Sequence, residues 1–190
     1  MSIKKNLRLF MLPLKKIHDA FPMTGRIYEI GSGFGVIGLF LAELSNKRTI
    51  IEIDKDKKKL SLAKSQAKMK NILFEHGDAL TYSYKPCQGA ILSDFLHHLK
   101  YDEQVIVLKK ISRKLATGGV LVVKEIDKND GLLMHCSRIW DFVFYPNDKI
   151  YYRSVNDWKK VLRDLHLKVK VSREVRWFPG STHLFICKKV

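Results

Sequence analysis

The sequence has few cysteines and no long apolar run. Cys87, Cys136 and Cys187 are odd in number and lie far apart, so they match neither a disulfide framework nor a paired metal-ligand spacing. No apolar run approaches the roughly 20 residues that a membrane span requires. Residues 1–21 are too basic and too interrupted for a secretory signal peptide. These absences indicate a cytoplasmic protein with reduced thiols.

Acidic residues are also scarce. The 190 residues include 19 Asp and Glu against 35 Lys and Arg, a formal net charge of +16. Such an excess attracts nucleic acid, an acidic membrane surface or an anionic substrate. The alternative is that the charge serves solubility alone, since net charge carries no information about the fold.

Apolar, β-branched runs alternate with helical patterns through the first two thirds of the chain, which has no internal repeat. The expected strands are 26–30, 48–53, 71–75, 89–94 and 119–126. The expected helices between them are 36–46, 56–69 and 101–115. Strands that alternate with helices predict a doubly wound, mostly parallel α/β sheet.

The last third has a different pattern. Residues 154–165 predict a helix that begins at Ser154, and two strand patterns follow at 167–175 and 182–188. Pro179-Gly180 separates these two strands, which favours an antiparallel hairpin. The sequence therefore predicts a seven-stranded sheet with a C-terminal antiparallel hairpin, formed by residues 25–190.

A glycine-rich turn follows the first strand and reads Glu-Ile-Gly-Ser-Gly-Phe-Gly over residues 29–35. Its three glycines allow a tight turn and a close approach of the backbone to a ligand. Gly33 to Gly38 also satisfies the dinucleotide pattern G-x-G-x-x-G. The strand ends at Ile30, however, so Gly33 comes too late to be the first glycine of the turn. Glu29 suits a ligand with cationic groups and would be a poor neighbour for a pyrophosphate.

These residues resemble the class I S-adenosylmethionine-dependent methyltransferases, and the resemblance extends from about Arg26 to the C-terminus. EIGSGFG is similar to the first motif of that family. Asp54, in IEIDKD, matches the acid that holds the ribose hydroxyls, with Glu52 as the alternative if the register slips. His76-Gly77-Asp78-Ala79 resembles the segment near the adenine, and LATGGVLVVKE at 115–125 resembles the turn into the fifth strand.

The resemblance implies a Rossmann-like methyltransferase fold, S-adenosylmethionine as the cofactor and S-adenosylhomocysteine as the product. It implies no requirement for a metal. The residues expected to bind the cofactor are Glu29, Gly31, Ser32, Gly33, Gly35, Asp54, Lys55, Asp78, Ala79 and Asp94.

The fourth strand ends in Ser-Asp-Phe-Leu-His-His over residues 93–98. Ligands gather at the carboxyl ends of the strands in such a sheet, so these side chains are expected beside the transferring methyl group. The string from His98 to Glu103 resembles small-molecule O-methyltransferases in which a histidine acts as the base. His98 is therefore the first candidate for the catalytic base and His97 the second. The alternative is that both histidines pack under the cofactor.

The segment at about 127–153 is an aromatic-rich insertion. Its aromatic residues either form the wall of a pocket for an apolar or aromatic small-molecule acceptor or only cap the sheet. Asp127, Asn129 and Asp130 lie near the place where catechol-type enzymes hold magnesium, but the match is poor. The sequence therefore does not support a metal site.

Residues 1–24 alternate apolar and basic positions at helical spacing, up to Pro13. This pattern predicts a lid over the active site, peripheral contact with an anionic membrane through residues 1–20, or both.

Two rival functions stay open. In a 2′-O-ribose RNA methyltransferase, the Lys-Asp-Lys-Glu set would consist of Lys15 or Lys16, Asp94, Lys124 and Glu174. Glu174 falls on the sixth expected strand, whereas those enzymes place this acid near the seventh. The second rival is an inactive cofactor-binding module, which the intact glycine-rich turn disfavours.

Overall fold

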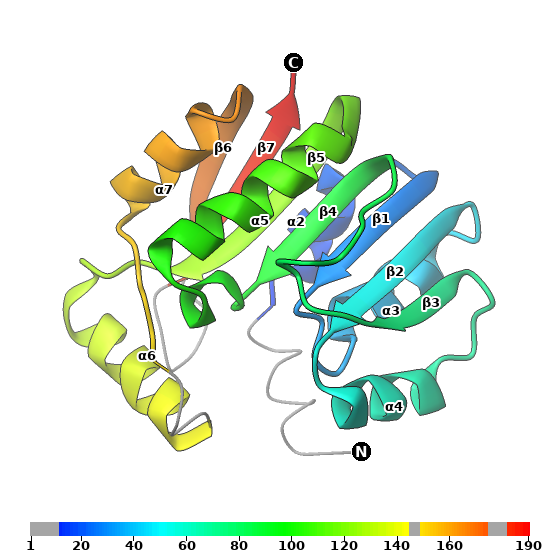
Figure 1. Ribbon diagram of the computed structural model, residues 1–190, viewed down its shortest axis with the longest axis horizontal. Helices are drawn as coiled ribbons and strands as arrows, with labels where there is room; N and C mark the ends of the chain where they lie inside the picture. Colours follow the sequence, from blue (N-terminus) through cyan, green and yellow to red (C-terminus); the bar gives the residue numbers. More distant parts are fainter. Residues whose placement is uncertain (1–11, 145–148, 175–181) are drawn as a thin grey trace.

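The computed structural model describes residues 12–144, 149–174 and 182–190. It contains a seven-stranded sheet with helices on both faces (Figure 1). The strands are β1 (Gly25–Ile30), β2 (Arg48–Asp54), β3 (Ile72–His76), β4 (Cys87–Ser93), β5 (Leu115–Ile126), β6 (Leu167–Glu174) and β7 (Thr182–Lys189). The helices are α2 (Leu14–Ala20), α3 (Val36–Leu44), α4 (Lys57–Gln66), α5 (Tyr101–Lys114), α6 (Gly131–Phe144) and α7 (Val155–Arg163), with a short 3-10 turn, η1 (Leu96–His98).

The strand order is β3-β2-β1-β4-β5-β7-β6. Neighbouring strands from β3 to β5 are parallel, whereas β7 runs antiparallel to both β5 and β6. The predicted Rossmann-like methyltransferase fold with C-terminal antiparallel strands is confirmed. Pro179-Gly180, the expected turn of the hairpin, lies outside the described residues.

Two apolar clusters cover the two faces of the sheet. On one face, α5 and α7 contribute Val107, Leu108, Ile111, Trp158 and Leu162. On the other face, α2 and α3 contribute side chains such as Ile17 and Leu41. This arrangement explains why the central strands are almost continuously apolar, because a parallel sheet is buried on both faces.

Local signals in the sequence set the starts of several helices. The Ser154 side chain accepts a hydrogen bond from the Asp157 backbone N–H, and Asp157 accepts one in return, so a capping box opens α7. Asp56 caps α4 in a similar way through the backbone N–H groups of Lys58 and Lys59. Pro13 immediately precedes α2.

Part of the basic N-terminal segment belongs to the core of the domain. Leu12, Ile17 and Phe21 are almost fully buried in the cluster beside α3. The expectation of a lid or of membrane contact therefore falls mainly on residues 1–11, which lie outside the described residues.

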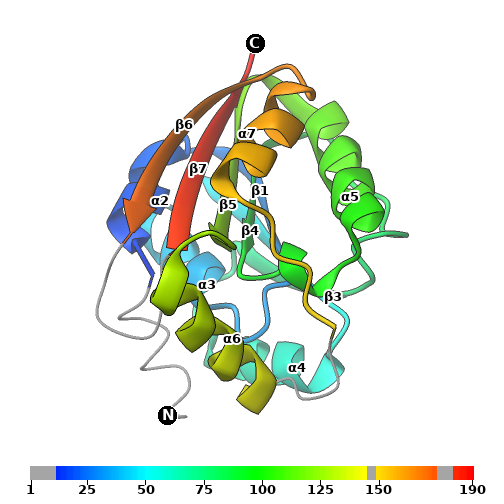
Figure 2. The same cartoon turned by 90° about the vertical axis from the view of Figure 1, so that its left-hand side faces the viewer.

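The predicted insertion at 127–153 contains α6, for which the sequence analysis expected no helix. It follows β5 and projects beyond the carboxyl ends of the parallel strands (Figure 2). Among the described residues, no helix is both long enough and apolar enough to cross a membrane.

Candidate functional site

The backbone conformation of the glycine-rich turn explains its glycines. Gly31, Gly33 and Gly35 have φ angles of 69°, 56° and 65°, in the left-handed region that favours glycine. A Cβ on Gly31 would lie 2.2 Å from a ring carbon of Phe95. The N–H groups of Gly31 and Ser32 donate to the Ile53 carbonyl at 2.9 and 3.1 Å. The turn therefore begins at Gly31, as the register argument predicted.

A pocket lies beside this turn, at the carboxyl ends of β1, β2 and β4. It contains about 740 Å³ of empty space, with its open mouth included. Its lining residues are Gly31, Gly33, Ile53, Asp54, Lys55, Lys59, Gly77, Asp78, Ala79, Asp94, Phe95, His98 and Leu99. Four separate motifs of the sequence, which follow β1, β2, β3 and β4, thus meet at one site.

Two of the predicted acids line this pocket from neighbouring strand ends. The Asp54 Oδ2 accepts a hydrogen bond from the Gly33 N–H at 2.7 Å, and its Oδ1 accepts one from the Asp56 N–H at 2.8 Å. The Asp78 Oδ1 accepts one from the Leu80 N–H at 2.8 Å. These bonds hold both carboxylates in place before any ligand arrives.

Glu29 and Ser32 have a different environment. Glu29 is buried, and its Oε2 accepts a hydrogen bond from the Gly38 N–H at 2.6 Å, near the start of α3. Together with Leu12, Val36, Ile37 and Ser93, these two residues line a smaller cavity. Gly35 caps α3 and does not line the larger pocket. Contact of Glu29, Ser32 and Gly35 with the cofactor stays a prediction.

Glu52, the alternative to Asp54, is fully buried beneath α3. A Cβ on Gly38 would lie 1.5 Å from its Oε1, so a larger residue at that position would displace the Glu52 carboxylate. Burial raises the pKa of Glu52 well above its usual value, and the neighbouring Glu29 carboxylate raises it further. Asp54, not Glu52, lines the pocket.

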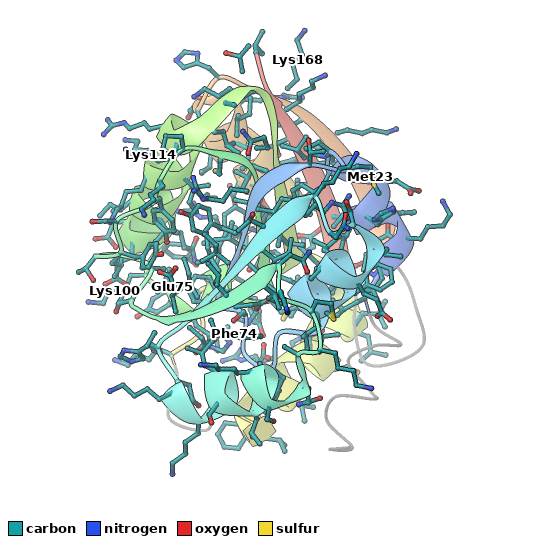
Figure 3. All side chains as sticks on the ribbon, turned by 90° about the vertical axis from the view of Figure 1, so that its right-hand side faces the viewer. Met23, Phe74, Glu75, Lys100, Lys114 and Lys168 are labelled. Carbon is teal, nitrogen blue, oxygen red and sulfur yellow. The ribbon has the colours of Figure 1, made fainter. Side chains whose placement is uncertain are left out.

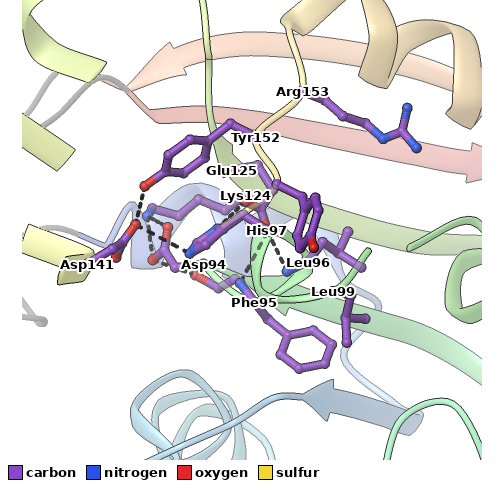
Figure 4. A network of polar contacts seen from close by, with 12 residues as sticks. Asp94, Phe95, Leu96, His97, Leu99, Lys124, Glu125, Asp141, Tyr152 and Arg153 are labelled. Carbon is purple, nitrogen blue, oxygen red and sulfur yellow. Dashed lines mark hydrogen bonds and ion pairs between the residues drawn. The ribbon is translucent and has the colours of Figure 1, made fainter. Parts of the chain in front are cut away.

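Asp94 stands at the carboxyl end of β4 with a φ angle of 51°, which is unusual for a residue with a side chain. Its two carboxylate oxygens each accept a hydrogen bond from the Lys124 Nζ at 2.7 Å (Figure 4). Lys124 is only 1% exposed. An ion pair with a buried lysine therefore fixes the carboxylate that borders the pocket.

His97 lies behind the pocket in a buried polar cluster (Figure 4). Its Nδ1 is 2.6 Å from the Glu125 Oε2, and the other oxygen of Glu125 accepts hydrogen bonds from the N–H groups of Phe95 and Leu96. Burial alone would lower the pKa of His97, but Glu125 and then Asp141 outweigh it and raise that pKa to about 9. His97 is therefore protonated at neutral pH, and it does not line the pocket.

His98, in contrast, lines the pocket. Burial lowers the pKa of His98 to about 3, assisted by the positive charge on His97 and by Lys55. The structure thus places the two adjacent histidines in opposite protonation states: a buried imidazolium at 97 and a neutral imidazole at 98.

The aromatic residues of the insertion do not line the pocket, as far as they are described. Phe142 is 68% exposed, and the Tyr151 ring packs edge-on against Tyr101. The Tyr152 hydroxyl donates to the Asp141 carboxylate. Tyr145 and the side chains of Trp140 and Phe144 lie outside the described residues.

The acids considered for magnesium have other partners. The Asp127 Oδ1 accepts hydrogen bonds from the N–H groups of Asn129 and Val155, and Asp130 forms an ion pair with Arg173 at 2.6 Å. Within the described part of the chain, no three metal-ligating side chains gather in a way that would hold an ion.

Sequence reasoning named no individual role for five of the lining residues, namely Ile53, Lys59, Gly77, Phe95 and Leu99, although Gly77 and Phe95 belong to segments that it expected at the site. All five lie within or beside the motifs that it identified, so their position in the chain could have indicated them. It also missed Glu125 and Asp141 as partners of His97. No local pattern indicates them. Glu125, for example, is 28 residues from His97 along the chain and contacts it only in the folded protein.

The comparisons with known proteins agree with this geometry. Residues 27–119 match the model of a family described as a methyltransferase domain. A search of the curated proteins finds no match to the sequence.

Several solved structures are similar in fold. An S-adenosylmethionine-dependent methyltransferase from Methanosarcina mazei aligns with a TM-score of 0.74 at 20% identity, over 94% of this chain and 98% of that one. The magnesium protoporphyrin IX methyltransferase of Synechocystis, solved with bound S-adenosylhomocysteine, has a TM-score of 0.77 at 15% identity, over 100% and 88%. An O-methyltransferase family 2 protein from Planctomyces limnophilus, solved with apigenin, has a TM-score of 0.74 at 16% identity, over 98% and 62%.

At these identities the likeness to solved structures establishes the fold, and the match over residues 27–119 identifies the domain. Together with the pocket, these findings indicate an enzyme that transfers methyl groups, with S-adenosylmethionine as its cofactor.

Proposed function

We propose that the enzyme methylates a hydroxyl group of a small phenolic or otherwise apolar acceptor, with His98 as the general base. One observation carries the proposal: His98 and Asp94 border the same pocket as the glycine-rich turn and Asp54. The residues expected to hold the donor and those expected to serve the acceptor are thus adjacent.

The residues of the pocket fit S-adenosylmethionine. Asp54 offers carboxylate oxygens to the ribose hydroxyls, and Asp78, in the same pocket, offers an acceptor for the amino group of the adenine. Ile53, Phe95 and Leu99 supply apolar surface for a flat ring. When bound, this cofactor supplies an electrophilic methyl group for in-line displacement by a nucleophile.

The residues expected around the acceptor have separate roles in proton uptake, hydrogen bonding and positioning. His98 is uncharged at neutral pH, and burial makes it a weak base. To take the hydroxyl proton of the acceptor, it needs its charged form to be stabilised, and the Asp94 carboxylate acts in that direction. Lys124 holds the Asp94 carboxylate through both oxygens, which fixes a hydrogen-bond acceptor at the edge of the pocket. His97 is protonated and bound to Glu125, so we assign it a positioning role.

A panel of phenols and catechols, compared with total RNA in a methyl-transfer assay, tests the acceptor class. We expect label in a small molecule, and labelling of RNA alone would refute the proposal. The His98→Ala variant should lose about 100-fold or more in turnover if His98 is the base. His135→Ala, at an exposed position on α6, is the control. Full turnover by His98→Ala would remove the base assignment.

A second candidate function is 2′-O-ribose methylation of RNA. It is favoured by the contact of Lys124 with Asp94, and by the ion pair between Lys16 and Glu174 at 2.6 Å. All four residues belong to the Lys-Asp-Lys-Glu set considered above. The net charge of +16 suits an RNA partner as well.

We also propose that the enzyme acts in the cytoplasm and that residues 1–20 contact an anionic membrane surface. The basic and apolar positions of this segment support the idea. Flotation with vesicles that contain phosphatidylglycerol tests it, with the full chain compared to a chain lacking residues 1–11. Equal flotation of the two chains would contradict a role of those residues.

A further inference from the structure

Helix α6 presents its apolar side chains outward. Leu132, Ile139 and Val143 are 79%, 64% and 63% exposed. With about 3.6 residues per turn, these positions fall on one side of the helix. The opposite side carries Ser137 and Asp141, which are almost fully buried. The helix is thus amphipathic, but its polar side faces the protein.

Polar contacts fix this orientation. Asp141 accepts a hydrogen bond from the Tyr152 hydroxyl, and its Oδ2 lies 3.6 Å from the Nε2 of the protonated His97 (Figure 4). A rotation of α6 that buried Leu132 and Ile139 would carry Asp141 into water and leave His97 without that carboxylate. The outward apolar face is therefore built into the fold.

Cations lie at the same edge of the molecule. Lys55, Lys57 and Lys58 follow the carboxyl end of β2 and are exposed, and Arg138 is exposed on α6 itself. Figures 1 and 2 show α6 and the start of α4 at this edge.

This edge also carries acidic residues, and cations lie elsewhere on the molecule as well. Asp78 and Asp102, both exposed, and the half-buried Glu103 are acids that follow strands β3 and β4 at this same edge. Lys114 and Lys168 lie toward the opposite end of the molecule (Figure 3). The net charge of +16 therefore supplies attraction to an anionic surface, whereas the apolar face of α6 supplies the orientation.

We propose that the outward face of α6 docks the enzyme on an anionic membrane surface, with its aliphatic side chains among the lipid chains. Exposed Leu, Ile, Val and Phe side chains on a helix that carries the exposed Arg138, at an edge with further lysines, fit an interfacial helix. A second copy of the chain would bring another charge of +16 against the first. RNA offers no apolar counterpart to the aliphatic side chains.

This docking goes beyond the proposed function, because it does not depend on which acceptor is methylated. It places the pocket, at the carboxyl ends of β1, β2 and β4, on the membrane side of the enzyme. A lipid-soluble acceptor would then reach His98 and Asp94 without crossing open water.

Flotation with two kinds of vesicle tests the proposal: phosphatidylcholine alone, and about three parts phosphatidylcholine to one part phosphatidylglycerol. The double variant Leu132→Gln/Ile139→Gln removes the apolar face and keeps a good helix former. Leu44→Gln/Ile106→Gln is the matched control, because these residues are 43% and 46% exposed on other helices. A chain lacking residues 1–11 separates the N-terminal segment from α6. Thermal unfolding and S-adenosylmethionine binding of each variant establish that the fold and the pocket are intact.

We expect the full chain to float with the anionic vesicles and much less with neutral ones. The α6 variant should lose about tenfold or more in partitioning, whereas the Leu44/Ile106 control should not. Three outcomes would overturn the proposal: no flotation of the full chain, equal flotation of the α6 variant, or an α6-dependent dimer in solution. Because cofactor binding and methyl transfer in detergent are measured separately, failure of the docking is distinguishable from failure of the proposed function.

Discussion

Helices α5 and α6 have the same length, 14 residues, and both are amphipathic, yet they face the protein with opposite sides. Helix α5 buries Val107, Leu108 and Ile111 against the sheet. Helix α6 buries Ser137 and Asp141 and exposes its aliphatic residues. The comparison teaches that helical periodicity shows where a helix has two faces, whereas tertiary contacts decide which face turns inward.

The largest expected effect is the difference in stability between two variants, each with one isoleucine replaced, in α5 and in α6. Ile111→Ala should lower the free energy of unfolding by about 2–5 kcal/mol, because it opens a cavity in the core under α5. Ile139→Ala should change it by about 0.5 kcal/mol or less, because that side chain is 64% exposed. Urea denaturation of both variants measures the difference. Comparable losses would mean that α6 buries its aliphatic face in solution.

The second prediction concerns pH and the polar contacts of α6. The pKa of His97 rises from 6.5 to about 9 in the folded protein, where Glu125, Asp141 and Asp94 face it. Its stabilising contribution is therefore fully present below pH 6.5 and is lost as the pH rises through 9. The free energy of unfolding should therefore be up to about 3 kcal/mol higher at the low pH than at the high pH.

The free energy of unfolding, measured by urea denaturation below pH 6.5 and above pH 9, tests this dependence. The His97→Gln variant is the control, since it cannot take up the proton and should show a flatter profile. A wild-type profile as flat as that of the variant would argue against a protonated His97.

The smallest expected effect comes from a single hydroxyl. Tyr152→Phe removes the donor to Asp141 and should lower the free energy of unfolding by about 1 kcal/mol. Because this contact holds α6 against the protein, the backbone of α6 should then open to solvent more often. Tyr101→Phe is the matched control, because Tyr101 is 47% exposed and its hydroxyl donates to the backbone carbonyl of Tyr152 and not to a side chain of α6. Hydrogen exchange in α6 measures the effect, and faster exchange should occur in the Tyr152 variant alone.

Much of the fold was predictable because its signals are local. Alternating apolar runs indicated all seven strands, and Ser154 and the glycine-rich turn marked two helix starts. Helix α6 was missed, although Leu132, Ile139 and Val143 follow helical spacing. The aromatic residues of the same segment indicated a pocket wall or a cap on the sheet instead.

The site was predictable where its residues lie in contiguous motifs. Gly31, Asp54, Asp78 and His98 line one pocket because parallel strands end at one edge. The different environments of His97 and His98 could not be read from the sequence. They depend on Glu125, which approaches only when β5 pairs with β4.

The position of β7 has a consequence for how the chain reaches this structure. Strand β6 is synthesised before β7, yet it reaches the sheet only through β7, which pairs with β5 on its other side. Until β7 arrives, one edge of β5 has no neighbouring strand, and β6 has nothing in the sheet to pair with. A pairing that spans so much of the sequence slows folding. Completion of the sheet is therefore expected to be a late event, and during synthesis the β5 edge would be the place where chaperones or wrong strands bind first.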